Sequence, residues 1–593
     1  MILIKNLEQK LLTFADNDLS KKEILIRDEH LYNIVVERIQ QQIKKLLINS
    51  TNDADNSFAD NLSSIRSSLI HLPNELFPFI FVYFHPFELI DTFGHLDTRL
   101  DCLIQQSITQ LDYIRHSGIS AIGKKNESFF QFVTKLKLTY PQLQNLSKPL
   151  TDLFPKLQSV LLTQIMLDDG VQEKKFLTKY VDSLKIILES FSMEFDDMIT
   201  HEFTQHLFDE QSRLKQMVLT FTRQGCMINT VPIDNDYGLL PCPSLTHLTI
   251  DLTFDFEIFI LCEYLPCIEY LNIRLQHGHH LTHEYDYNTI KQKQLSRVLK
   301  HLRIKLRDYH LVPFRVLLLL IEQYVHSLQY LSLNTCLDSP VDGHQLNLLM
   351  KLKSVHFCFR FSVPETFDYA QLMSTFNIST VMCFPNQNGD CVLLTLPYEF
   401  DELPDISNRM LQYCLPPNAD PMTMIKMPAV TRISFTCDND DSLKLELFLF
   451  VQNACINLKE LTISPYQLST QIIADRQVQL IKVTKMNILS KTIEYSSLKR
   501  LLLLVPNIKE LYIETLLPTS VYYEELLNDQ ELALVRKMLN TVKTVFACGN
   551  NADDDEEEAK VIEKLNEQLK MTFPNAQCTT TSDSGFEVDN EEY

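Results

Sequence analysis

The sequence has little glycine, with 11 residues in a chain of 593, and it has no tryptophan. Phosphate-binding loops need closely spaced glycines, yet neither G-x-G-x-x-G nor G-x-x-x-x-G-K-S/T occurs in the sequence. The G-x-S-x-G turn that carries the nucleophile of many serine hydrolases is missing as well. These absences exclude the nucleotide-binding enzymes that depend on such loops, and no catalytic residue can be named.

Positive charge and long apolar runs are also in deficit. Lysine and arginine number 54 against 76 acidic residues, which gives a net charge of −22 and disfavours nucleic acid as a partner. A membrane span needs about 18 apolar residues, but the best run, 311–325, is interrupted by Arg315 and Glu322. The first residues lack the apolar stretch of a secretory signal. We expect an intracellular protein of the cytoplasm, the nucleus or both, without a membrane partner.

Metal-binding spacings are missing too, because none of the 14 cysteines forms a C-x-x-C pair. Scattered cysteines in an intracellular chain are typically reduced and buried. His279 and His283 stand one helical turn apart in a histidine-rich stretch, but no H-E-x-x-H motif or third ligand accompanies them. An exposed polar loop is the favoured interpretation, with a metal site as the alternative. We therefore expect no metal and no cofactor.

The two ends of the chain differ from its middle in composition. Residues 1–48 form a predicted N-terminal helical segment, because apolar residues recur at helical spacing over 31–48. Residues 49–68 are rich in Asn, Asp and Ser, which is typical of a flexible linker. Residues 549–593 contain the acidic run 553–558, and they are predicted to be an acidic, largely disordered tail.

The stretch 72–104 carries unusually many apolar residues. From Leu76 to Phe84 almost no polar face remains, and Pro86 is expected to end this first helix at His85. A second helical pattern runs from Phe87 through Leu100. A helix that is apolar all round must be buried all round. It is covered either by its own chain or by a partner, and the residues alone leave both possibilities open.

This stretch resembles the F-box motif in the order and spacing of Leu72-Pro73, Glu75-Leu76, Ile80-Phe81, Tyr83-Phe84, Pro86 and Glu88-Leu89. The resemblance implies a three-helix module, over residues 69–115, that docks on the Skp adaptor of cullin–RING ubiquitin ligases. Carried over residue by residue, it implies seven adaptor-facing or supporting positions: Leu72, Pro73, Leu76, Ile80, Phe84, Pro86 and Leu89.

A degenerate repeat of the form apolar-x-x-apolar-x-apolar occupies much of the remaining chain. Its twelve copies begin at Leu157, Leu214, Leu245, Ile268, Leu299, Leu328, Leu352, Ile378, Val430, Leu458, Val483 and Ile508. Proline stands two residues before the first apolar position in five of the twelve, which is far more than its overall frequency explains. Several neighbouring starts are 23 to 28 residues apart, which matches the period of leucine-rich repeats.

Helical apolar segments fill several of the intervals, for example before Pro266 and before Leu328. The units resemble long, irregular leucine-rich repeats, and they predict a solenoid over residues 116–548. The fold class is therefore α/β, with a short all-α F-box-like module followed by a solenoid of parallel strands and helices. Six strand residues are candidates for a protein-binding concave face, with a plain solvated face as the alternative: His247, Tyr270, Tyr330, Arg432, Lys459 and Tyr512.

Together these resemblances imply a non-catalytic, substrate-recognition adaptor of a cullin–RING (SCF-type) ubiquitin ligase. In this interpretation the F-box-like module docks on the Skp adaptor and the repeats bind an unknown target protein. The alternative is a leucine-rich-repeat scaffold without a ligase link, whose apolar hairpin only caps the solenoid. An enzyme with an unfamiliar repeat fold is the third hypothesis.

Overall fold

The computed structural model describes most of residues 85–513 and two short C-terminal segments. The described residues are 85–114, 127–146, 148–166, 171–196, 206–221, 241–253, 257–275, 298–306, 311–376, 380–386, 388–415, 425–435, 442–463, 478–488, 495–513, 542–548 and 576–581, with Asn74, Phe77, Phe81, Phe203 and Asp255. The chain divides into two compact units: unit 1 is Met1–Asp251 with Tyr264–Cys267, and unit 2 is Leu252–Glu263 with Ile268–Tyr593.

The first helices of unit 1 whose bounds the structure describes are α6 (Pro86–Phe93) and α7 (Thr98–Ser107). His85 is extended, as a residue before proline prefers, which confirms the predicted boundary at this position. Its side chain accepts a hydrogen bond from the Phe87 N–H, and the Glu88 carboxylate accepts one from the His85 N–H, which forms a capping box.

The structure divides the helical pattern that was expected to run from Phe87 through Leu100. Helix α6 ends where the Gly94 N–H donates to the Ile90 carbonyl at 2.8 Å, and α7 begins only at Thr98. A Cβ atom at Gly94 would lie 2.5 Å from that same carbonyl oxygen, so the turn requires a glycine. Apolar residues recur on both sides of the break because each helix buries its own apolar residues, such as Phe93 in α6 and Leu100 in α7.

The remainder of unit 1 is a sheet whose strands follow one another in chain order and pair in parallel. Its strands are β1 (Gln110–Asp112), β2 (Lys135–Thr139), β3 (Ser159–Ile165), β4 (Ser190–Phe195), β5 (Gln216–Phe221) and β6 (His247–Leu252). Helices α8 (Tyr140–Gln144), α9 (Leu150–Leu153) and α10 (Val171–Leu184) occupy the intervals. Alternate strand residues such as Phe191, Met193 and Phe195 are fully buried, as period-2 alternation requires.

The first sheet of unit 2 is parallel up to a reversal at its end. Strands β7 (Tyr270–Leu275), β8 (His301–Leu306), β10 (Tyr330–Leu337) and β11 (Ser354–Phe361) pair in parallel, and β9 (Leu311–Val312) also pairs with β10. Helices α12 (Glu257–Tyr264) and α14 (Phe314–Tyr324) confirm the helices predicted before Pro266 and Leu328. Helix α15 (Tyr369–Ser374) follows β11.

The repeat copy predicted to begin at Ile378 contains a strand, but this strand does not pair with the strand of the preceding repeat. Strand β12 (Val381–Pro385) pairs antiparallel with β13 (Cys391–Thr395), which in turn pairs antiparallel with β11. A short turn joins β12 to β13, with the Asn386 N–H donating to the Asp390 carbonyl at 2.8 Å and Gly389 at a φ of 87°. Strands β11 and β12 therefore run in the same direction, but β13 lies between them, so the expected direct parallel pairing was wrong here.

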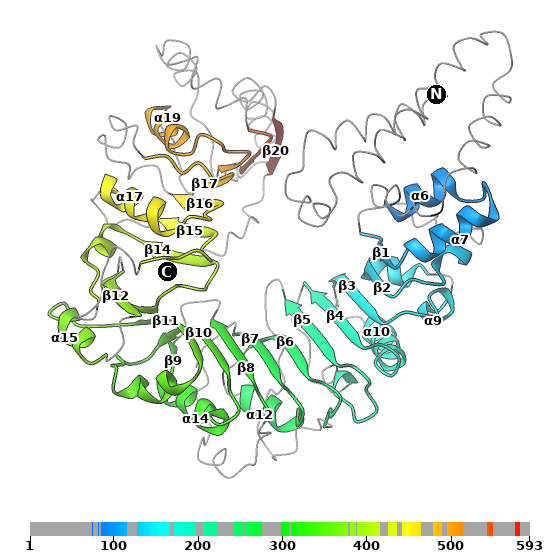
Figure 1. The fold of residues 1–593 in the computed structure, drawn as a ribbon, viewed down its shortest axis with the longest axis horizontal. Coiled ribbons are helices and arrows are strands. Elements are labelled where there is room, and N and C mark those ends of the chain that lie inside the picture. Colours follow the sequence, from blue (N-terminus) through cyan, green and yellow to red (C-terminus); the bar gives the residue numbers. More distant parts are fainter. Residues whose placement is uncertain are drawn as a thin grey trace, which may run out of the picture. The chain divides into compact units, whose positions relative to one another are not determined.

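The second sheet of unit 2 is again parallel and in chain order. Its strands are β14 (Glu402–Ile406), β15 (Arg432–Phe435), β16 (Glu460–Ile463), β17 (Lys485–Ile488), β18 (Glu510–Ile513), β19 (Thr544–Cys548) and β20 (Gln577–Thr581). Helices α17 (Leu445–Ala454) and α19 (Tyr495–Leu504) lie along one side of these strands in Figure 1. Strand β20 extends the sheet beyond residue 548, where the predicted solenoid ended.

The strand positions confirm the fold class of a solenoid-like stack of parallel strands with intervening helices. Eleven of the twelve predicted repeat starts lie two residues before a strand, and Ile378 lies three residues before one. Equivalent apolar residues such as Ile433, Leu461 and Leu511 are buried in one continuous core. Residues 1–48, the linker 49–68, the histidine-rich stretch around His279 and the acidic run 553–558 lie outside the described residues, so their assignments remain predictions.

Candidate functional site

The strands of unit 2 expose a polar face opposite the core, which we call the polar strand face. Its first feature is a row of four rings, the ring ladder: Tyr270, His301, Tyr330 and His356. Their successive ring centroids are 5.9, 5.7 and 5.4 Å apart. Tyr270 and Tyr330, both predicted from the sequence, are brought together by a histidine from the strand between them.

The register of the parallel strands builds this ladder. Tyr270 is paired with His301 and His301 with Tyr330, so these three rings lie one strand spacing apart. His356 lies two residues beyond Ser354, the register partner of Tyr330. The neighbouring residues Leu271, Leu302 and Leu331 point to the opposite face and are fully buried. The rings therefore stand on a rigid support, and all four are half-buried rather than free to rotate in solvent.

The carboxylate of Glu399 ends the ladder. One oxygen lies 3.3 Å from His356 Nε2, and the other accepts a hydrogen bond from the Tyr330 hydroxyl at 3.1 Å. Burial lowers the pKa of His356, although Glu399 acts in the opposite direction. Burial and then the charge of Glu399 raise the pKa of Tyr330. Both shifts favour the uncharged forms of His356 and Tyr330, so this end of the ladder can both donate and accept hydrogen bonds.

An ion network follows directly beside Glu399. Arg432 reaches Asp401 at 2.9 Å and Glu402 at 3.2 Å, and Lys305 reaches Glu402 at 3.4 Å. Burial alone would raise the pKa of Asp401, but the positive charges of Lys305 and Arg432 lower it. The predicted residue Arg432 is therefore on the polar strand face, where its charge is matched by its neighbours.

The same alternation of charges continues over β16 to β18. Lys485 lies 2.8 Å from the Glu460 carboxylate, which also accepts a hydrogen bond from Asn487 at 2.9 Å. The Lys485 ammonium stands 4.8 Å from the ring centroid of Tyr512, in a cation–π contact. The predicted residue Tyr512 thus lies on the polar strand face and is held by the network.

The other two predicted residues of a strand face are Lys459 and His247. Lys459 immediately precedes β16, and it is exposed at the edge where the strands begin, beside Thr431 and Thr484. His247 is the exposed first residue of β6 in unit 1, where its Nδ1 lies 2.9 Å from the Thr246 hydroxyl.

The hairpin positions taken from the F-box resemblance are described only in part. Leu72, Pro73, Leu76, Ile80 and Phe84 lie outside the described residues. Pro86 is the half-buried first residue of α6, and Leu89 is buried.

The described aromatic residues of the hairpin pack within their own chain. Phe77 and Phe81 are buried, with ring centroids 5.4 Å apart, and Phe81 lies 5.9 Å from Phe93. Phe87 packs edge-on against Tyr113, which directly follows β1, at 4.8 Å. The hairpin and the first strands of unit 1 therefore share one apolar core.

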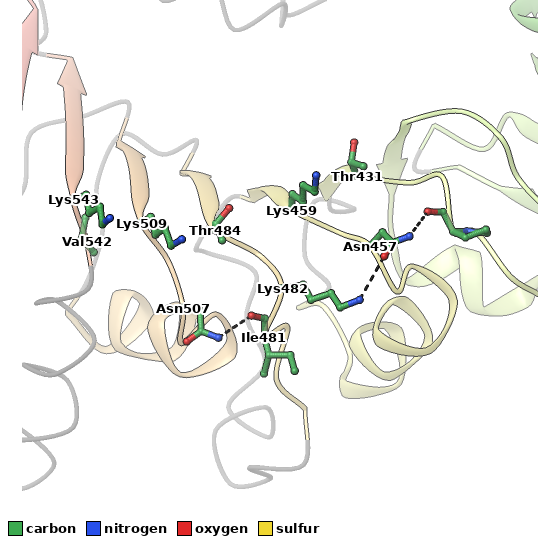
Figure 2. Close-up of a pocket in the computed structure, with 11 residues that line it drawn as sticks. Thr431, Asn457, Lys459, Ile481, Lys482, Thr484, Asn507, Lys509, Val542 and Lys543 are labelled. Atoms are coloured by element: carbon green, nitrogen blue, oxygen red, sulfur yellow. Dashed lines mark hydrogen bonds between the residues drawn. The ribbon is translucent and has the colours of Figure 1, made fainter. Parts of the chain in front are cut away.

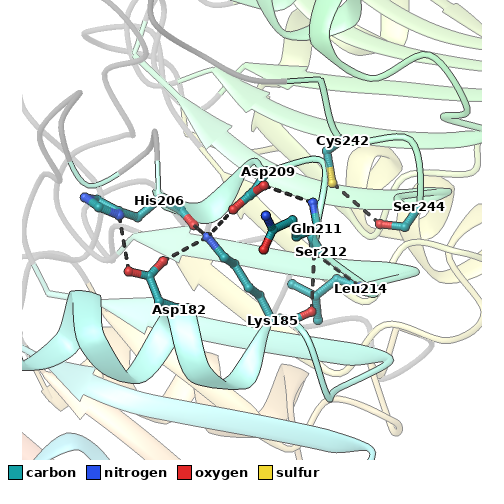
Figure 3. Close-up of polar contacts among 9 residues, drawn as sticks. All are labelled: Asp182, Lys185, His206, Asp209, Gln211, Ser212, Leu214, Cys242 and Ser244. Atoms are coloured by element: carbon teal, nitrogen blue, oxygen red, sulfur yellow. Dashed lines mark hydrogen bonds and ion pairs between the residues drawn. The ribbon is translucent and has the colours of Figure 1, made fainter.

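A buried lysine in unit 1 forms a polar cluster that the sequence did not indicate (Figure 3). The Lys185 side chain is only 6% exposed, and its ammonium group donates to Asp182 at 2.8 Å, Asp209 at 2.9 Å and the His206 carbonyl at 2.9 Å. Burial alone would lower the pKa of Lys185, but the hydrogen bonds to the two carboxylates raise it. This cluster joins the end of α10 to the segment before β5, which is a structural role.

The structure adds His301, His356 and Glu399 to the predicted residues. A usable signal existed for His301, because it lies two residues after the repeat start at Leu299, as Tyr270 and Tyr330 do after theirs. In the described part of the chain no group of histidine, cysteine and acidic residues is arranged to hold a metal ion. Among the described helices, none has the length and apolarity needed to cross a membrane.

No family model and no curated protein matches this sequence. Among solved structures, a chain from the complex of Rad7 and Elc1 in yeast aligns with a TM-score of 0.28 and 12% identity, covering 85% of this chain and 95% of that chain. A leucine-rich-repeat protein of Leptospira interrogans aligns with a TM-score of 0.21 and 11% identity, covering 80% and 96%. These TM-scores are low, and the repeat fold rests on the strand register of the chain itself.

Proposed function

We propose that this chain is a substrate-recognition adaptor of a cullin–RING ubiquitin ligase. The polar strand face carries the proposal, because it provides a rigid surface on which a target protein can be held. The hairpin around Pro86 would dock on the Skp adaptor, as its resemblance to the F-box implies.

The chemistry of the polar strand face suits a protein target. Tyrosine and arginine are enriched in protein interfaces, where their large side chains contribute much of the binding energy. Here Tyr270, Tyr330 and Arg432 are already held in place by their neighbours, so binding costs little side-chain entropy. The ion pairs also supply counter-charges within the face, so a partner does not have to provide them.

The adaptor role needs no catalytic group in this chain. A ligase adaptor accelerates transfer by holding a target lysine close to the loaded conjugating enzyme, so its contribution is proximity. Ubiquitin transfer itself would be carried out by other subunits.

A pull-down with purified Skp adaptor tests the ligase link. Wild-type protein should retain the adaptor, and the double variant Leu72→Ala, Pro73→Ala should lose it while keeping its circular dichroism spectrum. A matched control, Ile187→Ala with Ile456→Ala, removes two exposed apolar residues elsewhere, which are 45% and 49% exposed. This control should retain the adaptor as well as the wild type does.

The second candidate function is a repeat scaffold without a ligase link. It is favoured by the burial of Phe77 and Phe81 and by the packing of Phe87 on Tyr113, which are what a capping hairpin would show. If wild-type protein retains no Skp adaptor, or if the control variant loses it equally, the scaffold is the better account.

A further inference from the structure

A pocket of about 1070 Å³ opens on the edge of unit 2 where strands β15 to β19 begin (Figure 2). Four lysines are among the residues that line it: Lys459, Lys482, Lys509 and Lys543. All four are exposed. We call this pocket the lysine groove, and nothing in the proposed function so far makes use of it.

The repeat itself builds the groove. Lys459, Lys509 and Lys543 each immediately precede a strand, and Thr431 and Thr484 hold the same place before β15 and β17. The N–H of each residue in this row donates to the carbonyl of the preceding one, at 2.7 to 2.8 Å between Thr431 and Lys543. The row is therefore an extension of the sheet, and its side chains repeat at the strand spacing of about 4.8 Å.

A second row, two residues earlier in each repeat, forms the other wall. The Asn457 amide donates to the Pro428 carbonyl at 2.9 Å, and the Asn507 amide donates to the Ile481 carbonyl at 2.8 Å. Lys482 reaches the Asn457 side-chain oxygen at 3.4 Å. These bonds brace each loop against the preceding one, so the groove is preformed rather than made of loose side chains.

The groove lysines differ in their partners from the three lysines of unit 2 that form ion pairs. Lys300, Lys305 and Lys485 each form an ion pair with a glutamate. None of the four groove lysines pairs with a carboxylate in the described part of the chain. Positive charge thus gathers, without compensation from the described residues, on a protein whose net charge is −22.

We propose that the lysine groove binds an extended, acidic segment of a partner protein. This inference rests on the proposed role of the repeats in holding a target, and it does not require the ligase link. Carboxylates on the ligand would supply the partners that the four ammonium groups lack. Ile481, which is 58% exposed at the groove, provides an apolar contact for a side chain between them.

The lining of the groove favours a peptide over a nucleic acid. Single-stranded nucleic acids bind on surfaces that stack their bases on aromatic side chains, and none of the eleven lining residues is aromatic. A chain of this net charge also repels a polyphosphate at long range. A short peptide carries fewer charges and enters the groove with only local neutralisation.

Strand spacing sets the length of the ligand. Lys459 and Lys543 are three strand steps apart, which is about 14 Å, and an extended peptide of four or five residues covers about that distance. Acidic side chains at alternate positions of such a peptide point to the same side. A probe of about ten residues is therefore long enough to occupy the whole row.

Fluorescence anisotropy with the full-length chain tests the proposal. The probe is a fluorescein-labelled peptide of alternating glutamate and serine around a central leucine, and its control has glutamine in place of glutamate. The glutamate peptide should bind and should weaken as salt is added, because exposed charge pairs are screened. The double variant Lys459→Gln, Lys509→Gln should bind it about five- to tenfold more weakly.

A matched variant removes the same charge elsewhere. Lys135→Gln with Lys353→Gln changes two exposed lysines outside the groove and should bind like the wild type. A second groove pair, Lys482→Gln with Lys543→Gln, should repeat the loss. Thermal melts followed by circular dichroism should coincide for all variants, because every changed side chain is exposed.

Four results would overturn the proposal. The first is that the glutamate peptide does not bind. The second is that the Lys135/Lys353 variant loses as much affinity as the groove variants. The third is that a single-stranded oligonucleotide of equal charge binds as tightly as the peptide, which would make the groove a general polyanion site. The fourth is that the glutamate peptide binds only after residues 553–558 are changed to Asn and Gln, which would assign the groove to the chain's own acidic run. Because no assay here contains the Skp adaptor, each result is independent of the ligase link.

Discussion

Lys185 in unit 1 and the lysine groove of unit 2 use the same side chain in opposite ways. The Lys185 ammonium is enclosed and donates to three oxygen atoms, whereas the groove ammonium groups are exposed and have no described carboxylate partner. Burying a charge is costly unless it is paired and hydrogen-bonded, so the Lys185 cluster exists only because its partners are fixed. An exposed lysine carries no such cost, which leaves its charge available to a ligand.

The polar strand face lies between these extremes. Arg432 and its carboxylates are roughly half-exposed, with side-chain exposures of 43%, 50% and 35% for Arg432, Asp401 and Glu402. Pairs of this kind contribute little to stability, but they fix the direction of each side chain. Burial and pairing together therefore rank the charged groups from those that stabilise the fold to those that remain available for binding.

The largest expected effect is on Lys185. The substitution Lys185→Met keeps the aliphatic packing but leaves two carboxylates and the His206 carbonyl without their donor, which should lower the free energy of unfolding by about 2 kcal/mol. Urea denaturation followed by far-UV circular dichroism measures this, since the chain has no tryptophan to report by fluorescence.

The matched control for this substitution is the exposed pair of Lys215 and Glu189. These side chains are 60% and 57% exposed and lie 3.4 Å apart, so Lys215→Met should change the stability by less than about 0.5 kcal/mol. Equal losses in the two variants would show that the Lys185 cluster contributes no more than a surface ion pair.

A smaller effect is expected on the acid limb, by which we mean the fall in the free energy of unfolding as the pH is lowered below about 5. A hydrogen bond from the Gln211 N–H and then the Lys185 ammonium lower the pKa of Asp209. Its folded pKa is therefore below its unfolded value of about 3.9, so its contribution is complete above that value and is lost as the pH falls through the folded pKa. Asp209→Asn should reduce the acid dependence of urea unfolding between about pH 5 and pH 2.

The groove variant Lys459→Gln, Lys509→Gln serves as the control for that measurement. Neither lysine faces a described carboxylate, so this variant should keep the acid limb of the wild type. An acid limb that is unchanged in Asp209→Asn would contradict the assigned role of Asp209.

The smallest expected effect is a difference in the free energy of unfolding between a variant of the polar strand face and a variant of the groove. Arg432→Met breaks two ion pairs and should lower the free energy of unfolding by about 0.5–1 kcal/mol. Lys459→Gln, in the adjacent repeat, should have no measurable effect on stability. The same urea titrations compare the two variants, and a loss in Lys459→Gln equal to that in Arg432→Met would remove the distinction between paired and available charge.

Local patterns of the sequence predicted the strands well, because each buried residue of a repeat lies close to the others in the chain. The apolar triplet placed eleven of twelve starts at the same distance before a strand. The same triplet occurs before β2 at Val133 and before β19 at Val542, so the pattern extends beyond the twelve predicted copies. The antiparallel turn also carried a signal, since Asn388-Gly389 is a typical hairpin pair.

The site residues were harder to predict, because they depend on register and on contacts between distant segments. The ring ladder requires that Tyr270, His301 and Tyr330 align across three strands, which no single repeat reveals. Lys459 shows how sensitive this is: it lies one residue before β16, and a shift of one residue sends a side chain to a different side of a strand. Lys185 gave no signal, since its partners are set by tertiary packing.

The row of residues that precede strands β15 to β19 (Thr431, Lys459, Thr484, Lys509 and Lys543) determines which ligand charges the groove can match. Each repeat supplies one such position, and that position lies outside the apolar core that the repeat must preserve. Exchanging threonine for lysine there, or gaining or losing one whole repeat, alters the number and spacing of charges in steps of about 4.8 Å. Ligand preference can therefore change one repeat at a time, without altering the residues that stabilise the fold.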